Sequence, residues 1–274
     1  MRRREFLGSM AVGVAGTTIG STITNGTNQG QLSGQTFKPI KILEFADMHL
    51  VADNDKAIVY PRKVIQAMNA EGGDLALACG DLATKGARAE LELSKSILDE
   101  LKMPYYPVIG NHDALYQGEQ AETLFGEIFS LAQNNYHFIK NGVHLIGISH
   151  GCGKAYRDNS VRPEVMTWIK ETLAKIPGNE PIVLFSHYPF GKGVRYRTSN
   201  SVEVLKMFKD KKLLAIISGH FHGNTERREN GILMTTTACC SGTRGNHDRT
   251  KAKGYRIFNI DKEMKVTTEF KEVK

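Results

Sequence analysis

Aspartate and histidine side chains stand directly after an apolar run near the start of the predicted folded region. Residues 42–45 are mostly apolar, and Asp47 and His49 follow them. Side chains two positions apart leave a strand on the same side, so a carboxylate and an imidazole would lie together at the end of this strand. The pair alone is compatible with a metal site, but an aspartate that follows a strand more often caps a turn. Its interpretation depends on the other strand ends.

The same chemistry recurs at the ends of four more apolar runs. The side chains concerned are Asp81, Asn111 with His112, His187, and His220 with His222. Because ligand sites of open α/β sheets lie beyond the carboxyl ends of the strands, we expect these side chains to converge on a metal site. The remaining histidines of the central region, His137, His144 and His150, lie within or at the end of a hairpin pattern and are interpreted as core residues.

The apolar pattern predicts strands and helices that would bring these residues to one edge of a sheet. Helical spacing over 54–71 and 91–101 is followed each time by an apolar run typical of a buried strand, at 75–79 and 105–109. A hairpin is predicted over 136–149, turning at Asn141-Gly142. The other predicted elements are helices at 119–132, 163–173 and 202–208, and strands at 181–185, 213–217, 232–237, 255–260 and 264–270. This β-α-β alternation predicts an α/β fold.

Composition and charge fit a globular protein that binds an anionic ligand. The 274 residues are 41% hydrophobic and 24% charged, which excludes a disordered chain and a multi-span membrane protein. The formal net charge of +7 favours phosphate esters, although it would also suit nucleic acid. Because the basic residues are scattered, no stable nucleic-acid partner is expected. The four cysteines form no CxxC pair, so a zinc ribbon is not expected.

In their order and spacing, the five motifs resemble those of the calcineurin-like metallophosphoesterase family. The resemblance covers about residues 40–260 and rests on Asp47-x-His49, Gly80-Asp81, Gly110-Asn111-His112-Asp113, His187 and Gly219-His220-x-His222. It implies a four-layer α-β-β-α sandwich of two mixed sheets, with a two-metal site at the carboxyl ends of the strands. It also implies that Asp47, His49, Asp81 and His222 hold one metal and that Asp81, Asn111, His187 and His220 hold the other, with Asp81 bridging.

Such a centre would hydrolyse a phosphomonoester or a phosphodiester. Carboxylate and imidazole ligands suit Zn, Mn or Fe better than Ca or Mg, and two such ions would lower the pKa of a shared water so that hydroxide attacks the phosphorus. His112 is positioned to protonate the leaving alkoxide, and Asp113 would hold its imidazole in the required tautomer. Two alternatives stay open: a nuclease of the same superfamily, and a metal-bound binding protein without catalytic activity.

The sequence departs from the family pattern at positions that distinguish subfamilies. No tyrosine follows the Gly-Asp motif within 82–86, which argues against the iron centre of the purple-acid type. The motif is closest to the cyclic-nucleotide phosphodiesterase branch, but Thr84 stands where that branch usually has an acidic residue. Many relatives have His-His at the fourth motif, whereas this chain has His187-Tyr188, so Tyr188 is expected to line the pocket.

Candidates for substrate contacts come from two loops and from the third motif. Arg195 and Arg197, together with Lys192, could bind a phosphate, or could equally belong to a solvated loop. A second Gly-Asn-His-Asp at 245–248 repeats the third motif, and we expect His247 to contact substrate if this loop reaches the site. Asn111 is expected to contact substrate as well as metal.

The first 36 residues are predicted to form a signal peptide and flexible linker before a single metallophosphoesterase domain over 37–274. A basic start, a short apolar segment and a polar tail are typical of a targeting sequence too short to span a membrane. Arg3-Arg4-Glu5-Phe6-Leu7 resembles the twin-arginine export signal of bacteria, with a basic disordered tail as the alternative. We therefore expect a periplasmic or extracellular enzyme that meets the export machinery and acts on a small phosphate ester.

Overall fold

The predicted alternation of strands and helices is present in a computed structural model, which describes residues 36–115, 120–150 and 159–274. The strands are β1 (Ile40–Phe45), β2 (Leu75–Ala78), β3 (Tyr105–Pro107), β4 (Tyr136–Lys140), β5 (Val143–Ile148), β6 (Pro181–Ser186), β7 (Lys212–Ser218), β8 (Thr225–Glu229), β9 (Ile232–Thr236), β10 (Gly254–Ile260) and β11 (Val266–Glu272). The helices are α1 (Asp55–Glu71), α2 (Arg88–Leu98), α3 (Ala121–Phe129), α4 (Pro163–Ala174) and α5 (Ser201–Met207). The predicted signal segment lies outside the described residues.

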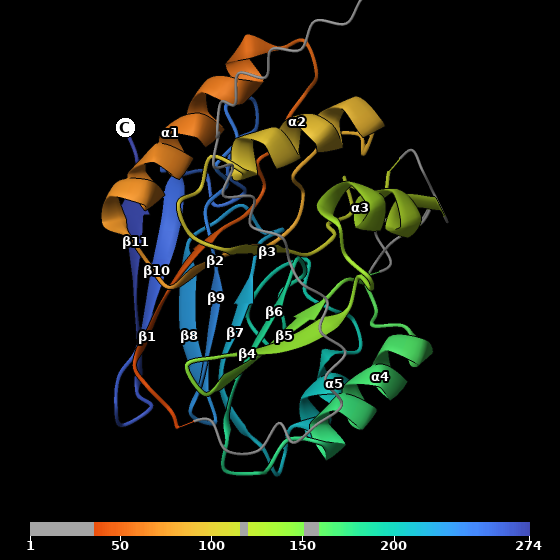
Figure 1. Ribbon diagram of the computed structural model, residues 1–274, viewed down its shortest axis with the longest axis vertical. Helices are drawn as coiled ribbons and strands as arrows, with labels where there is room; N and C mark the ends of the chain where they lie inside the picture. Colours follow the sequence, from red (N-terminus) through yellow and green to blue (C-terminus); the bar gives the residue numbers. More distant parts are fainter. Residues whose placement is uncertain (1–35, 116–119, 151–158) are drawn as a thin grey trace, which may run out of the picture.

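Two mixed sheets form the centre of the fold (Figure 1). The first sheet has five strands in the order β11-β10-β1-β2-β3, with β1, β2 and β3 parallel and β10 antiparallel to both of its neighbours. The second has six strands in the order β4-β5-β6-β7-β9-β8, of which β5, β6, β7 and β9 are parallel and the edge strands β4 and β8 antiparallel. Each sheet therefore presents a set of parallel carboxyl ends.

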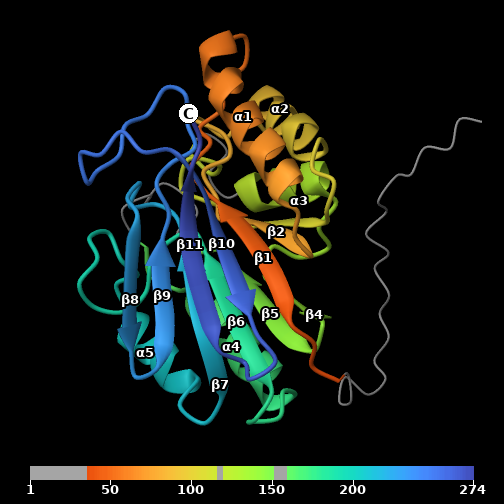
Figure 2. The ribbon, with the colours of Figure 1, turned by 90° about the vertical axis from the view of Figure 1, so that its left-hand side faces the viewer.

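Three apolar layers separate the helices and sheets. One lies between α1, α2, α3 and the first sheet, one between the two sheets, and one between the second sheet and α4 and α5. Side chains alternate across a strand, so Leu43 and Phe45 of β1 pack toward the helices. Ile40 and Ile42 of the same strand pack toward the second sheet. The result is the predicted four-layer α-β-β-α sandwich, seen from a second side in Figure 2.

Local sequence explains where several elements begin and turn. The side chain of Asn54 accepts a hydrogen bond from the amide of Lys56 at 3.1 Å and so caps the start of α1. Pro163 opens α4, where its missing N–H is not needed. The hairpin of β4 and β5 turns at Asn141-Gly142, both with positive φ, as predicted.

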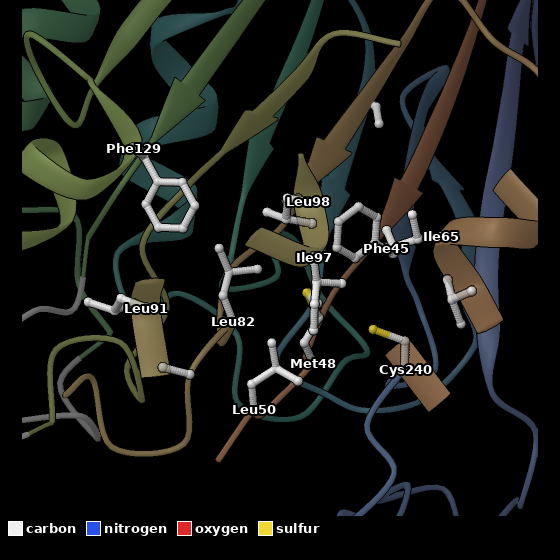
Figure 3. Close-up of a cluster of buried hydrophobic side chains, with 14 of the residues drawn as sticks. Phe45, Met48, Leu50, Ile65, Leu82, Leu91, Ile97, Leu98, Phe129 and Cys240 are labelled. Carbon is white, nitrogen blue, oxygen red and sulfur yellow. The ribbon is translucent and has the colours of Figure 1, made fainter. Parts of the chain in front are cut away.

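The loop after β1 is anchored in the layer between the first sheet and its helices. Met48 and Leu50 are fully buried there near Phe45, as Figure 3 shows. Burying such a side chain stabilises the fold by about 1.5–3 kcal/mol. Asp47 and His49 alternate with these core residues, and their side chains reach the strand ends of the second sheet. The core therefore holds the loop that carries the first motif.

Strand β8 was not predicted from the sequence. Its five residues, Thr225–Glu229, are all polar and alternate between partly buried and exposed at the edge of the second sheet. The segment contains no apolar residue, so no strand pattern is present there in the sequence. It is a strand because its backbone pairs with β9. Among the described residues, no helix has the length and apolar content needed to cross a membrane.

Candidate metal centre

Seven side chains predicted to bind metal lie together where the parallel strands of both sheets end. They follow β1 (Asp47, His49), β2 (Asp81), β3 (Asn111), β6 (His187) and β7 (His220, His222). Potential ligand atoms of Asp47, His49, Asp81 and His222 lie within 4.8 Å of one another, and so do those of Asp81, His187 and His220. Asp81 belongs to both groups, as expected of a carboxylate shared by two ions.

In the first group, imidazole and carboxylate atoms face one another across a small space. Nε2 of His49 lies 3.0 Å from Nε2 of His222 and 3.6 Å from Oδ2 of Asp81. Oδ1 of Asp47 lies 3.1 Å from Nε2 of His222, yet this buried oxygen accepts no hydrogen bond from any described residue. The ring of His222 is oriented by its Nδ1, which donates to the carbonyl oxygen of Gly245 at 3.1 Å.

Nε2 of His187 lies at the centre of the second group. It is 3.3 Å from Oδ2 of Asp81, 3.1 Å from Oδ1 of Asn111 and 3.1 Å from Nδ1 of His220. Nδ1 of His187 donates to the carbonyl oxygen of Cys79 at 2.8 Å, which leaves Nε2 as the ligand atom. Asn111 adds a neutral oxygen donor to this group.

The buried carboxylates and imidazoles are better suited to bind cations than to form hydrogen bonds with one another. Asp47 is 0% and Asp81 1% exposed, and such buried carboxylates require a metal or protonated partners. Burial lowers the pKa of His222, but the adjacent Asp47 outweighs burial and raises that pKa to about 11. Likewise, burial lowers the pKa of His187 while Asp81 raises it to about 9. Each carboxylate thus favours a positive charge beside it, which a divalent ion would supply.

Five of the ligand candidates have a left-handed backbone conformation. The φ angle is 60° at Asp47, 48° at His49, 53° at Asp81, 63° at His220 and 44° at His222. Each such residue is disfavoured by roughly 1–2 kcal/mol relative to the right-handed conformation. Backbone hydrogen bonds between the loops hold them in this strained conformation. The amide of Asp47 donates to the carbonyl oxygen of Gly80 at 3.0 Å, and the amide of His49 donates to the carbonyl oxygen of Asp81 at 2.9 Å.

Two glycines allow the loops after β2, β3 and β6 to approach one another. A Cβ atom at Gly110 would lie 2.2 Å from Oδ1 of Asp81. A Cβ atom at Gly80 would lie 2.8 Å from Cβ of His187, and its φ of 79° also favours glycine. The glycines of the second and third motifs are therefore required by packing around Asp81.

The ring of His112 lies beside this centre and belongs to neither ligand group. Its centroid is 4.7 Å from that of His49, and its amide donates to Oδ1 of Asp81 at 2.7 Å. Nδ1 of His112 donates to the carbonyl oxygen of Thr84 at 2.7 Å, so Nε2 is available for proton transfer. The Thr84 hydroxyl donates to the carbonyl oxygen of His49 at 2.8 Å, which ties the two histidine loops together.

The partner predicted for His112 is corrected by the structure. Oδ1 of Asp113 accepts from the amide of Ala83 at 2.8 Å, and Oδ2 accepts from the amide of Gly110 at 2.9 Å. Both carboxylate oxygens therefore bind backbone, and Thr84 takes the position expected of Asp113. Burial, and then the charge of Asp81, raises the pKa of Asp113 to about 7. Asp113 joins the loops after β2 and β3.

A cavity of about 800 Å³ opens over the centre. Its lining consists of His49, Asp81, Asn111, His112, Asn159, Tyr196, His220, His222 and residues 244–247. The repeated tetrapeptide is thus part of the lining through Gly245, Asn246 and His247. The long connection between β9 and β10, which carries it, extends past the strand ends in Figure 2.

Three other residues predicted to contact substrate are absent from this lining. Arg195 and Arg197 are exposed, and the guanidinium of Arg197 donates to the carbonyl oxygen of Gly191 at 3.0 Å. Tyr188 is fully buried, with its ring centroid 4.4 Å from that of His220, so it supports a ligand ring from behind. Tyr196, between the two arginines, reaches the cavity instead, and no motif in the sequence distinguishes it.

Comparison with known proteins places this geometry in a family. The model of the calcineurin-like phosphoesterases matches residues 40–224. A probable glycerophosphodiester phosphodiesterase GpdQ of Arcobacter nitrofigilis is 25% identical over 175 residues, which are 60% of this chain and 62% of that protein. A probable cyclic nucleotide phosphodiesterase of Fibrobacter succinogenes is 26% identical over 198 residues, 68% of this chain and 73% of that protein. The chain thus spans less than two thirds of the first relative.

Solved structures share the fold at low sequence identity. A dimetal phosphatase from Danio rerio superposes with a TM-score of 0.63 at 13% identity, over 84% of this chain and 98% of that one. The purple acid phosphatase PPD1 from yellow lupin seeds superposes with a TM-score of 0.66 at 14% identity, over 87% of this chain and 52% of that one. The family model spans 185 of the 274 residues, so the chain belongs to the calcineurin-like phosphoesterases.

Proposed function

We propose that the protein hydrolyses a small phosphodiester with two divalent transition-metal ions, Mn, Zn or Fe, and that a phosphomonoester is the alternative substrate. The observation that carries this proposal is the Asp81 carboxylate, which belongs to both groups of metal-ligand candidates. When bound, the ions would neutralise phosphoryl charge and activate the attacking water. The phosphodiesterase names of two relatives support the diester.

The side chains of this protein would orient the ester and supply a proton. Nε2 of His112 is the free ring nitrogen on the cavity wall, because Nδ1 is engaged by Thr84. It would donate its proton to the leaving oxygen. The rings of His187 and His222 are buried, and each donates from Nδ1 to a backbone carbonyl. These hydrogen bonds would keep the Nε2 ligand atoms fixed during hydrolysis of the ester.

The size of the cavity supports a small molecule over a polymer. Its volume of about 800 Å³ lies in the range of ligand pockets. The two relatives are named for different alcohols, one for glycerophosphodiesters and one for cyclic nucleotides. Both classes are small phosphodiesters, with two different alcohols in a glycerophosphodiester and a single nucleoside in a cyclic nucleotide. A nuclease would instead need a basic groove that follows a strand.

Metal analysis combined with an ester panel tests the proposal. The protein purified with Mn, Zn or Fe should hold close to two ions and hydrolyse aryl phosphodiesters faster than monoesters. Asp81→Ala should retain fewer ions than Asp47→Ala or His187→Ala, because it removes a ligand from both groups. The exposed Asp210→Asn variant is the matched control and should retain both ions.

Each part of the proposal has its own contrary result. Full activity after exhaustive chelation would rule out the metal requirement. Two bound ions without turnover of any ester would favour the binding-protein alternative. Rapid cleavage of single-stranded DNA or RNA, with no activity on small diesters, would favour the nuclease.

A further inference from the structure

Two exposed aromatic rings stand at the mouth of the cavity, on loops that come from different strands. Tyr196 lies between β6 and α5 and is 53% exposed. His247 lies between β9 and β10 and is also exposed. Their ring centroids are 5.6 Å apart, with the planes tilted by 60°. Both residues line the cavity. An exposed tyrosine contributes little to the core, so its placement needs another explanation.

The backbone holds Tyr196 in a conformation that is rare for a bulky residue. Its φ is 57°, in the left-handed region. The side-chain amide of Asn159 donates to the carbonyl oxygen of Tyr196 at 3.0 Å. On the next residues, Arg197 donates to Gly191 and the amide of Thr198 donates to the carbonyl oxygen of Pro189 at 2.7 Å. Strain maintained by this many contacts around an exposed ring points to a role outside the core.

The two rings stand over the metal-ligand histidines, one over each group. The centroid of Tyr196 is 5.8 Å from that of His220, at 79°. The centroid of His247 is 4.9 Å from that of His222, and its amide donates to the carbonyl oxygen of His222 at 3.0 Å. A phosphoryl group at the centre would therefore lie beneath both rings, and its ester substituent would leave the centre toward them.

The spacing of the rings determines how a substituent could bind. Stacked aromatic carbons lie roughly 3.5–4 Å apart, so a third ring between two others needs about 7 Å. The observed 5.6 Å between Tyr196 and His247 is too short for that arrangement. A planar ligand would instead stack on the exposed ring of Tyr196, with His247 beside it and not on its opposite face. Tyr196 is 53% exposed, and its hydroxyl has no hydrogen-bond partner among the described residues, so the ring is accessible to a ligand.

Resting on the proposed function, we propose that Tyr196 and His247 form a subsite for a planar aromatic substituent of the phosphate ester. The substituent is a nucleobase or an aryl ring, since both offer the π-face that Tyr196 can stack against. A glycerol-like substituent would leave both rings exposed. Tyr196 is thereby a specificity-determining residue for the hydrolysis.

Paired ligands isolate the contribution of the ring. Binding to the metal-loaded protein is measured by calorimetry in the His112→Ala background, so that slow turnover does not consume the ligand. Adenosine 5′-monophosphate and ribose 5-phosphate differ only in the base, and phenyl phosphate and cyclohexyl phosphate differ in planarity. A stacked base should tighten binding roughly 5–100-fold over the base-free ligand. Tyr196→Ala should remove this preference and Tyr196→Phe should retain it.

The remaining variants separate recognition from a structural effect. Ser199→Ala changes an exposed residue of the same loop and should keep the preference. His247→Ala should reduce this preference for the aromatic ligand.

A preference for phenyl over cyclohexyl phosphate identifies a general aryl subsite, whereas a preference confined to the nucleotide identifies a nucleobase subsite. Equal binding of all paired ligands, or equal weakening of both members of a pair by Tyr196→Ala, overturns the subsite. The proposed function fails separately, if the wild type hydrolyses no phosphate ester.

Discussion

The imidazole of His112 is oriented by the backbone carbonyl of Thr84, so the acid role that we propose for it depends on this side chain and on the loop that holds it. Replacing His112 with Ala should lower kcat by roughly 10²–10⁴-fold, the range for loss of a general acid, while metal content stays unchanged. The loss should be smaller for nitrophenyl esters than for alkyl esters, because an acidic leaving group needs little protonation. Steady-state rates on both ester types measure this difference. An equal loss on both would exclude His112 as the acid.

Asp113 makes a different prediction, since both of its oxygens bind backbone amides. Asp113→Asn places an NH₂ group against one of these donors and should destabilise the protein by about 1–3 kcal/mol. The leaving-group dependence of the rate should remain that of the wild type. Urea unfolding measures the first effect and the ester series the second, with the exposed Asp210→Asn as control. A changed leaving-group dependence would restore the catalytic role expected from the sequence.

At the scale of elements, the sequence predicts where the strands end. It does not predict the directions in which the side chains of the following loops point. Apolar runs define the strands, and parallel strands of an α/β sheet bring their carboxyl ends together, so the ligand candidates follow from the pattern. Adjacency in sequence suggested that Asp113 contacts His112, but its side chain reaches Ala83 instead. Tyr196 has no periodic or motif signal, because its place in the cavity depends on a loop closed by Asn159, distant in sequence.

Strand β1 carries a buried acid between the two sheets. Glu44 is 0% exposed, pairs in register with Arg256 of β10, and accepts a hydrogen bond from Thr237 on one oxygen only. Burial raises the pKa of Glu44 from 4.5 to about 8, against the lowering effects of Thr237 and Arg256. The folded state therefore binds more protons than the unfolded state between these values, and the contribution of Glu44 to stability falls as pH rises through this window.

The variant Glu44→Gln should remove this pH dependence, because glutamine resembles the protonated acid and cannot ionise. The free energy of unfolding of the variant, relative to the wild type, should increase steadily from about pH 5 to about pH 8. Urea unfolding at several pH values measures the difference, in which the other titrating groups cancel. Parallel pH profiles would show that Glu44 is ionised in the folded protein throughout.

At the scale of the whole molecule, the ligand candidates come from both sheets. Asp47, His49, Asp81 and Asn111 follow strands of the first sheet, whereas His187, His220 and His222 follow strands of the second. Bound ions would therefore link the two halves of the sandwich. Chelation should lower Tm, and an ion at 100 times its Kd should add about 2.7 kcal/mol to stability. Scanning calorimetry with and without chelator tests this, and Asp81→Ala should respond least.

The N-terminal sequence leads to a prediction about the location of the protein. We propose that Arg3 and Arg4 direct export, because paired arginines precede a short apolar segment. Substituting both with Lys should keep the protein in the cytoplasm of a bacterial host, while the purified variant retains activity. Cell fractionation with an activity assay measures the distribution. A wild-type protein found only in the cytoplasm would refute the export proposal and leave the metal centre unaffected.

The left-handed backbone at five ligand positions means that a substitution which stabilises the fold there would also remove a metal ligand. At Asp47, His49, Asp81, His220 and His222, a glycine would relieve the strain and at the same time delete the ligand. Laboratory evolution that rewards only the thermal resistance of the metal-free protein would therefore enrich inactive proteins at these five positions. A screen for a more robust enzyme has to select for turnover in every round, since the residues that would bind the metals also carry backbone strain that glycine would relieve.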